Sequence, residues 1–403
     1  ETCLRMLRSK LVEIKQEDPT FDFIRIGSDL SCAEDYREYL LSVRSQKVEG
    51  GNGVNKLIKN TRVFCGTTAA INGNMSLLKL KHFTLAIVDE SSQILEPHLI
   101  GLLSAHKEGK EAIDKFVLIG DHKQLPAVVQ QAPEESVVTE PELNAIGLSD
   151  CRNSLFERML SRFKTADGYD ERFVYMLTKQ GRMHRTIAEF PNIAFYGGKL
   201  DIVPLDHQQL PCDNAKTENS IEKMLSRHRV AFVAAEQPSL SPSIKTNQIE
   251  ADMIAATVYH IYRLKEKTFD KDKTIGVIVP YRNQISTVRN AIDRFGADVL
   301  HDITIDTVER YQGSQRDYII YGFSDIKGLI VTCKCLAAAG YSGTGKAYKT
   351  SEKCCKYCLV LDKENFFACE NGGVQLKPAY KYFLDEHGTL FCADAVVLLG
   401  KFE

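Results

Sequence analysis

Two carboxylates end an apolar run in the first half of the chain. Residues 83–88 are almost continuously apolar, and Asp89 and Glu90 follow directly. Such a run fits a strand buried on both faces of a parallel α/β sheet, where ligands bind beyond the carboxyl ends of the strands. There, Asp89 suits a phosphate-bound Mg²⁺ or its waters, and Glu90 suits deprotonating a water that attacks a γ-phosphate. An acidic strand end that caps the next helix is the structural alternative.

A second apolar run repeats this design. Residues 116–119 lead into Gly120 and Asp121, and Gln124 follows in the same loop. Glycine allows close approach of another backbone. The amide of Gln124 offers both a donor and an acceptor, as a sensor of the γ-phosphate requires. A turn closed by Asp121 is the simpler interpretation of this loop alone, but its combination with the acidic pair predicts a nucleotide site.

The two segments resemble known helicase motifs. IVDESSQILEP and VLIGDHKQLPAVV look like motifs II and III of superfamily 1 helicases, in the 5′-to-3′ branch that includes the nonsense-mediated-decay helicase and the replication helicase-nuclease. The resemblance implies two RecA-like lobes that close on ATP and Mg²⁺ and step along single-stranded nucleic acid. TRVFCGTTAAI resembles motif Ic, which implies that Thr67 and Thr68 contact the nucleic-acid backbone. Hydroxyls and turn amides commonly bind phosphates, in agreement with that role.

The second half of the chain continues the resemblance. Residues 177–184, LTKQGRMH, look like motif IV, and residues 190–200 extend the match. The resemblance implies that Arg182 reaches across the cleft to the γ-phosphate. Arginine suits this role because it stays charged and grips phosphate with two donors. An ordinary surface arginine is the alternative that the flanking match argues against.

A strand-to-helix turn precedes the next motif. Residues 277–284, VIVPYRNQ, resemble the strand and helix start that come before motif V. A helix N-terminus there can hold a nucleic-acid phosphate, with Tyr281 and Arg282 beside it. A turn without a binding role fits these residues equally well.

Residues 305–317, IDTVERYQGSQRD, resemble motif V itself. The resemblance implies that Thr307 contacts a backbone phosphate and that Gln312 and Gly313 lie beside the ATP phosphates. Gln315 stands where the family usually has a glutamate near the ribose, and glutamine can still hydrogen-bond a hydroxyl. A polar turn between two strands is the alternative.

Composition limits the classes of protein that can carry these motifs. The chain has 403 residues, of which 44% are hydrophobic and 26% charged, enough for two to three domains. The net charge of −2 gives no general basic field, so a nucleic-acid site must be a local groove. No apolar run reaches eighteen residues, so we expect no membrane span. Only five of the twelve cysteines precede residue 333, which favours a reducing, intracellular compartment, cytoplasmic or nuclear (or nucleoid).

Apolar runs and helical stretches alternate along the chain, which predicts an α/β protein. We expect a partial first RecA-like lobe at 1–165, a second RecA-like lobe at 166–325, and a small Cys-rich tail at 326–403. The predicted strands are 21–27, 61–66, 83–88, 116–119, 229–235, 274–279, 303–308 and 318–323, and the clearest predicted helix is 248–265.

Two motifs of the family find no match. No residues before Asp89 fit the phosphate-binding loop G-x-x-x-x-G-K-[ST], and motif VI does not follow motif V. We therefore expect a fragment of a helicase, and a catalytically inactive nucleic-acid-binding or scaffold fragment is the alternative function. Residues 340–346 do fit G-x-x-x-x-G-K, but Ala347 replaces the hydroxyl that binds Mg²⁺, and the order relative to Asp89 is wrong. A glycine-rich turn is the preferred interpretation.

The cysteines of the tail suggest a metal. Cys333, Cys335, Cys355 and Cys358 would supply four thiolates to zinc, although the first pair has only one intervening residue. Free thiols are one alternative. Another is that the tail is not a native continuation of the motor, because it starts where motif VI belongs. The sequence leaves single-stranded DNA and RNA equally open as the partner, and it identifies no protein partner.

Overall fold

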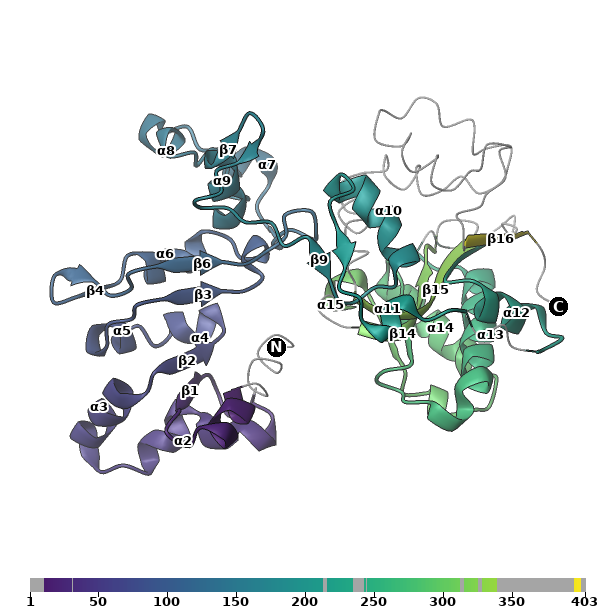
Figure 1. Ribbon diagram of the computed structural model, residues 1–403, viewed down its shortest axis with the longest axis horizontal. Coiled ribbons are helices and arrows are strands. Elements are labelled where there is room, and N and C mark those ends of the chain that lie inside the picture. Colours follow the sequence, from purple (N-terminus) through teal and green to yellow (C-terminus); the bar gives the residue numbers. More distant parts are fainter. Residues whose placement is uncertain are drawn as a thin grey trace. The chain divides into compact units, whose positions relative to one another are not determined.

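The computed structural model describes residues 11–30, 32–212, 216–234, 243, 245–311 and 315–324, with the backbone of strands 328–338 and 395–399. The chain divides into two units (Figure 1). Unit 1 comprises Glu1–His122 and Pro126–Tyr175, and unit 2 comprises Lys123–Leu125 and Met176–Glu403. Helices and strands alternate in both units, which confirms the α/β class. The sheet of unit 2 combines parallel and antiparallel pairs, so the expectation of a purely parallel sheet there is wrong.

Unit 1 contains two short parallel strand pairs. β1 (Phe23–Ile26) pairs with β2 (Val63–Gly66), and β3 (Ala86–Val88) pairs with β6 (Phe116–Leu118). Residues 11–17 are helical. The remaining elements of unit 1 are η1 (Glu34–Tyr39), α2 (Leu41–Gln46), α3 (Gly50–Asn60), α4 (Thr68–Asn72), α5 (Ser76–Leu80), η2 (Ser91–Gln93), α6 (Pro97–Leu103), β4 (His106–Lys107), β5 (Lys110–Glu111), α7 (Pro133–Ser136), α8 (Pro141–Ala145), α9 (Leu155–Arg162), β7 (Lys164–Thr165) and β8 (Gly168–Tyr169).

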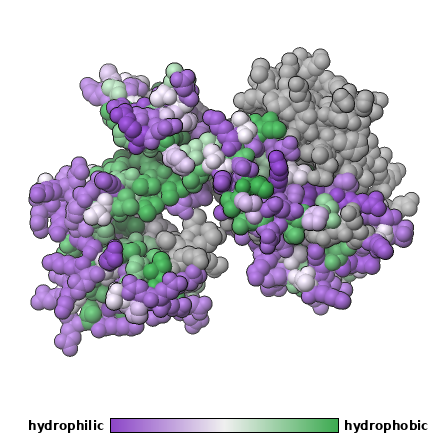
Figure 2. Space-filling view, viewed as in Figure 1, coloured by the Kyte–Doolittle hydropathy of each residue, from purple (hydrophilic) through white to green (hydrophobic). Residues whose placement is uncertain are grey.

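One face of the β3–β6 pair is exposed, so the prediction that these strands are buried on both faces is wrong. Ile87 is 62% exposed and Val117 43%, and Leu85 and Ile119 on their flanks are also exposed. Val88 points to the opposite face, where it packs with residues of α5, α6 and α9. Successive side chains of a strand alternate between faces, and helices of unit 1 cover only one of them. Figure 2 shows an apolar patch on unit 1.

Unit 2 is built on a six-stranded sheet in the order β13-β12-β14-β15-β11-β16. β12 (Ile275–Ile278) pairs in parallel with β13 (Thr304–Asp306) and β14 (Gln315–Gly322), while β15 (Gly328–Ala338) runs antiparallel between β14 and β11 (Val230–Ala234). The other elements of unit 2 are β9 (Lys179–Gln180), α10 (Arg185–Tyr196), β10 (Asp201–Ile202), α11 (Asp206–Gln209), α12 (Ser220–Arg227), α13 (Gln248–Lys265), η3 (Glu266–Thr268), α14 (Arg282–Asp293), η4 (Asp298–Leu300), α15 (Val308–Tyr311) and β16 (Ala395–Leu399).

Two strands of this sheet come from the range that the sequence analysis assigned to a separate tail. β15 and β16 both lie beyond residue 325, and both pair with β11. The predicted domain boundary after residue 165 falls within unit 1. Helix α13 spans the range predicted for it, and it packs with α12, α14 and the sheet around one apolar core.

A buried polar network fixes the strand ends of unit 2. The carboxylate of Glu250 is fully buried and accepts hydrogen bonds from the backbone N–H of Phe323 (2.7 Å) and Ser324 (2.9 Å). Gln284, also fully buried, accepts from the N–H of Asn247 and donates to its carbonyl, both at 2.9 Å. Asn247 in turn caps α13 by accepting from the N–H of Glu250. The starts of α13 and α14 and the end of β14 are therefore tied together.

A second polar cluster joins α12 to α13. Glu222 is almost buried and accepts hydrogen bonds from Thr217 Oγ1 (2.6 Å) and His260 Nδ1 (2.9 Å). Burial alone raises the pKa of Glu222, but the hydrogen bonds from Thr217 and His260, with Arg263 nearby, outweigh it and hold that pKa below its ordinary value of 4.5.

No helix among the described residues has the length and hydropathy needed to cross a membrane.

Replacing Glu222 with glutamine should reduce the dependence of stability on acid pH. A carboxyl whose pKa is lowered by folding stabilises the protein above its unfolded pKa, and this contribution disappears as the pH falls through the folded pKa. We expect thermal unfolding to show a wild-type advantage at about pH 6 that shrinks towards about pH 3. Glu218→Gln is the control, because the Glu218 side chain is fully exposed. An advantage over E222Q that stays constant across this range contradicts the prediction.

Candidate nucleotide and nucleic-acid site

The loops after β3 and β6 lie side by side in unit 1. Val88 is paired with Leu118, and the next N–H, that of Ile119, donates to the carbonyl of Val88 (2.9 Å). The N–H of Ser91 then donates to the carbonyl of Ile119 (2.8 Å). The parallel register therefore brings the acidic pair and the Gly120 loop to the same edge of the sheet.

The acidic pair has a defined local geometry. Asp89 is exposed, and its Oδ1 accepts a hydrogen bond from the N–H of Glu90 at 3.0 Å. Glu90 adopts a left-handed backbone conformation (φ 52°), which is uncommon for a residue other than glycine and is often found at functional sites. The side-chain amide of Gln93 donates to Glu90 Oε2 at 2.5 Å. Gln93 is a residue whose role sequence reasoning missed, although its place three residues after Glu90 is the signal that predicts such a contact.

Gly120 lies at a point of very close approach. A Cβ at this position would stand 2.8 Å from the backbone N of Ser92 and 3.0 Å from Ser91 Oγ, which no side chain can do without moving the neighbouring loop. The next residue, Asp121, donates its N–H to Ser92 Oγ at 3.1 Å. Asp89, Glu90, Gly120 and Asp121 therefore form one group in unit 1, whereas Gln124 belongs to unit 2.

The two threonines that are predicted to contact the nucleic-acid backbone, Thr67 and Thr68, follow β2. Thr67 is exposed, and its hydroxyl oxygen accepts a hydrogen bond from the N–H of Ala70 (3.2 Å), which makes it the N-cap of α4. Thr68 is the first residue of that helix. A hydroxyl that accepts from a backbone N–H still carries its own proton, so Thr67 retains a donor suited to a phosphate oxygen.

Arg182 stands on a rigid loop of unit 2. Its backbone N–H and that of Met183 donate to Gln180 Oε1 at 3.0 and 2.8 Å. Gln208, which is fully buried, donates to the carbonyls of Gln180 (2.8 Å) and Met183 (3.1 Å). The Arg182 side chain is exposed and makes no hydrogen bond or ion pair with the described residues. Hydrogen bonds to Gln180 and Gln208 therefore hold the backbone that carries the exposed charge of Arg182. The sequence analysis predicted no role for either glutamine.

The start of α14 presents the next predicted pair. Tyr281 is half-buried at the N-cap position, and Arg282 is the exposed first residue of the helix. Gln284, one turn into the helix, belongs to the buried network described above. This part of the site is thus anchored to α13 and to the end of β14.

The structure describes residues 305–311 and 315–317 of the segment that resembles motif V. Thr307 is 8% exposed and precedes α15, so its side chain is largely covered. Gln312 and Gly313 lie outside the described residues, and Gln315 is the exposed first residue of β14. Sequence reasoning gave no role to Tyr311, which ends α15 and is 1% exposed.

Tyr311 anchors this segment to the sheet. Its hydroxyl stands against Gly276 of β12, where an added Cβ would come within 1.7 Å of the hydroxyl oxygen. The guanidinium of Arg316 lies over the ring, 5.6 Å from its centroid, and also donates to Thr304 Oγ1 at 2.9 Å. Burial raises the pKa of Tyr311 to about 12. The signal in the sequence is a glycine within an otherwise apolar strand, which often marks a close approach.

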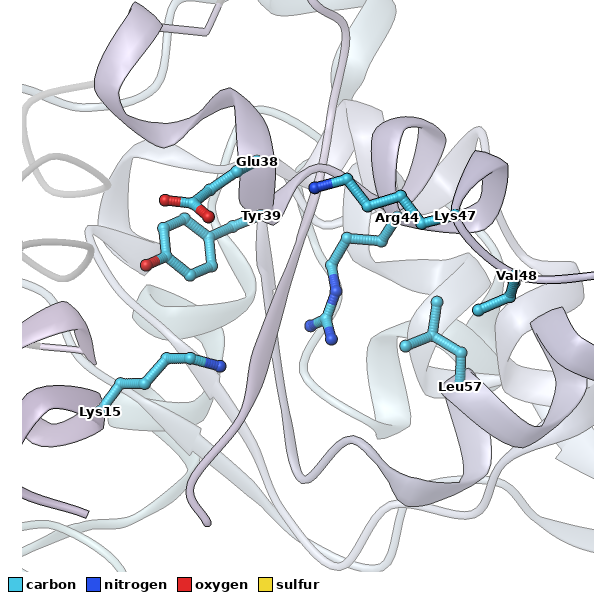
Figure 3. Close-up of a pocket in the computed structure, with 7 residues that line it drawn as sticks. All are labelled: Lys15, Glu38, Tyr39, Arg44, Lys47, Val48 and Leu57. Carbon is cyan, nitrogen blue, oxygen red and sulfur yellow. The ribbon is translucent and has the colours of Figure 1, made fainter. Parts of the chain in front are cut away.

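A pocket of about 260 Å³ lies elsewhere in unit 1 (Figure 3). Two of its cations, Lys15 and Arg44, form ion pairs with the same carboxylate, that of Asp22, each at 2.7 Å. None of the predicted site residues lines it. The lining residues are Lys15, Glu38, Tyr39, Arg44, Lys47, Val48 and Leu57.

The predicted zinc ligands fall largely beyond the described part of the chain. Cys355 and Cys358 lie outside the described residues, as does the glycine-rich segment 340–346. Cys333 and Cys335 belong to β15, of which the backbone is described. Within the described ranges, no group of three or more histidine, cysteine, aspartate or glutamate side chains forms a metal site.

Two stretches of the chain match known protein families. Matches to two families, each described as an AAA domain, span residues 8–132 and 151–326. The chain is 30% identical over 325 residues to the DNA replication ATP-dependent helicase/nuclease JHS1 of Arabidopsis thaliana, which covers 77% of the chain and 21% of that relative. It is 28% identical over 329 residues to the DNA replication ATP-dependent helicase/nuclease DNA2 of Xenopus laevis, a match that covers 76% of the chain and 28% of that relative. It is also 28% identical over 246 residues to the DNA polymerase alpha-associated DNA helicase A of Saccharomyces cerevisiae, a match that covers 59% of the chain and 33% of that relative. The chain thus spans about a third or less of these relatives.

Replacing Gly276 with alanine should displace Tyr311 and destabilise the protein. The added methyl cannot occupy the position of the tyrosine hydroxyl, and overpacking of this kind costs about 1–3 kcal/mol. We expect a lower thermal midpoint for Gly276→Ala. The loss should be smaller when the same change is made in a Tyr311→Leu background, where the contact of the added Cβ with Arg316 Cγ at 2.9 Å remains. Gly51→Ala is the control, because no atom lies within 4 Å of its added Cβ. An equal loss in both backgrounds would show that Tyr311 is not the neighbour that matters.

Proposed function

We propose that this chain, which belongs to the superfamily 1 helicases of the replication helicase-nuclease and nonsense-mediated-decay branch, is the motor region of an ATP-dependent helicase or translocase. In this proposal unit 1 corresponds to a partial first RecA-like lobe and unit 2 to the second. The observation that supports it most is the pairing of the two loops at the end of β3 and β6, which holds Asp89 and Glu90 beside Gly120.

The carboxylates fit the coordination chemistry of Mg²⁺ and ATP. Asp89 offers exposed carboxylate oxygens at a strand end, the hard ligands that Mg²⁺ prefers. Mg²⁺ and ATP, when bound, would supply the transferable γ-phosphate and neutralise its charge. Glu90, oriented by the Gln93 amide, would hold the attacking water and accept its proton.

By resemblance, residues of unit 2 are also assigned to the nucleotide. The exposed guanidinium of Arg182 would grip the γ-phosphate with two donors, from a loop that its glutamine neighbours keep in place. Gln124 would sense the γ-phosphate through its amide. By resemblance, Gln312 and Gly313 would lie beside the phosphates and Gln315 near the ribose.

The nucleic-acid contacts are assigned to the strand ends of both units. Thr67 and Thr68 would bind the backbone of a single strand from unit 1, and Tyr281, Arg282 and Thr307 from unit 2. Single-stranded DNA is the first candidate, because the relatives named above are DNA helicases. Zinc binding by the cysteines after residue 332 remains a separate proposal, testable by metal analysis.

A second function is favoured by one observation on the sequence. No phosphate-binding loop precedes Asp89, so these residues alone would form an inactive nucleic-acid-binding or scaffold fragment. A nucleic-acid-stimulated ATPase assay separates the two functions. Turnover that Glu90→Gln reduces at least about 100-fold, with Glu142→Gln unchanged, supports the motor. Strand binding without turnover supports the fragment.

Binding of single-stranded nucleic acid can be tested separately at Arg282. Replacing this exposed arginine with alanine should weaken binding of a fluorescent single-stranded oligonucleotide and reduce the salt dependence by about one unit of slope. The control is Arg227→Ala, an exposed arginine at the last residue of α12. Anisotropy titrations with DNA and RNA of the same length measure both variants and compare the two partners. Equal affinities for the Arg282 and Arg227 variants would remove Arg282 from the proposed interface.

A further inference from the structure

We propose that Ser91 and Ser92 are positioning residues that lock the carboxylate loop to the Gly120 loop, so that both respond together to a bound nucleotide. The inference rests on the proposed function, since it concerns the same site. Both serines follow the acidic pair directly, and both are almost completely buried, at 0% and 2% exposure. Buried hydroxyls at a ligand-binding edge need partners, and those partners identify the role.

The hydroxyl of each serine bonds the loop after β6 and not its own helix. The hydroxyl of Ser91 donates to the carbonyl of Ile119 at 2.8 Å, and the N–H of Ser91 donates to the same carbonyl at 2.8 Å. The hydroxyl oxygen of Ser92 accepts the N–H of Asp121 at 3.1 Å. The bonds therefore bracket Gly120 from both sides, across 28 and 29 residues of sequence.

The two loops pack closely against each other at Gly120. A Cβ on Gly120 would lie 2.8 Å from the Ser92 backbone N and 3.0 Å from Ser91 Oγ. At the other end of the same segment, Glu96 forms a bidentate ion pair with Arg158, in which both side chains are nearly buried. The stretch from Ser91 to Glu96 is thus fixed at both ends, and a shift of the acidic pair is transmitted to Gly120 and Asp121.

This linkage has a direct readout in the ligand-free protein. Backbone hydrogen exchange of the full chain reports the protection of the Ile119 to Asp121 segment. We expect Ser92→Ala to accelerate exchange at the Asp121 amide by about fivefold, the effect of losing one net hydrogen bond. Ser136→Ala is the matched control, because Ser136 is 2% exposed and its hydroxyl also donates to backbone carbonyls, those of Ala132 and Pro133. It should leave the segment unchanged.

A second arm tests whether the serines transmit binding. Adding Mg-ATP to the wild-type chain should slow exchange both at residues 89–93 and at residues 119–121. In the Ser91→Ala/Ser92→Ala variant, the slowing should remain at 89–93 and disappear at 119–121, an effect that a purely stabilising contact does not produce. The Ser136→Ala control should respond as the wild type does.

The outcomes separate this inference from the proposed function. If the double variant still shows slowing at 119–121, or if Ser92→Ala leaves exchange at Asp121 unchanged without ligand, the positioning role is overturned. If the wild-type chain shows no response to Mg-ATP, the proposed nucleotide site fails. The ligand-free comparison then still decides whether the serines hold the two loops together.

Discussion

The parallel register of β3 and β6 is the constraint on which the proposed site depends. Because Val88 lies opposite Leu118, the chain leaves both strands at the same edge, and the loops that follow must share the space beyond it. A slip of one residue would exchange the two faces of a strand and would move the Ser91 hydroxyl away from the carbonyl of Ile119. The pairing therefore positions the acidic residues as well as the strands.

Polar side chains with buried partners perform the equivalent task in unit 2. Glu250 binds the N–H groups at the end of β14, and Gln284 binds both backbone groups of Asn247. Removing one partner from such a pair leaves a buried donor or acceptor unsatisfied, which costs more than the bond itself contributes. Apolar packing assembles the sheet and its helices, whereas these directional bonds fix where each loop begins.

The sequence predicted the elements better than the contacts between them. The apolar runs before Asp89 and Gly120 are strands, and α13 has the predicted bounds, because local periodicity carries this information. Periodicity does not report whether a second layer covers a strand, so the exposure of Ile87 was not foreseen. β15 was missed because its lysine and cysteines interrupt the apolar pattern. The motif strings located the acidic pair, but bonds such as that from Gln208 to Gln180 join residues 28 apart and leave no local signal.

Asp89 and Arg182, the charged side chains proposed to meet Mg²⁺ and the γ-phosphate, share one physical property: their backbone is fixed while their charge remains exposed. Asp89 and Arg182 both have exposed side chains on loops held by buried or half-buried partners, serine hydroxyls in one case and glutamine amides in the other. A ligand that meets such groups does not have to order the loops first, so more of the interaction energy remains for binding. The same rigidity is required for electrostatic stabilisation of a transition state, because dipoles and charges that are already oriented need no reorganisation when the charge develops. The buried serines and glutamines are therefore as much a part of the proposed chemistry as the charged residues that they support.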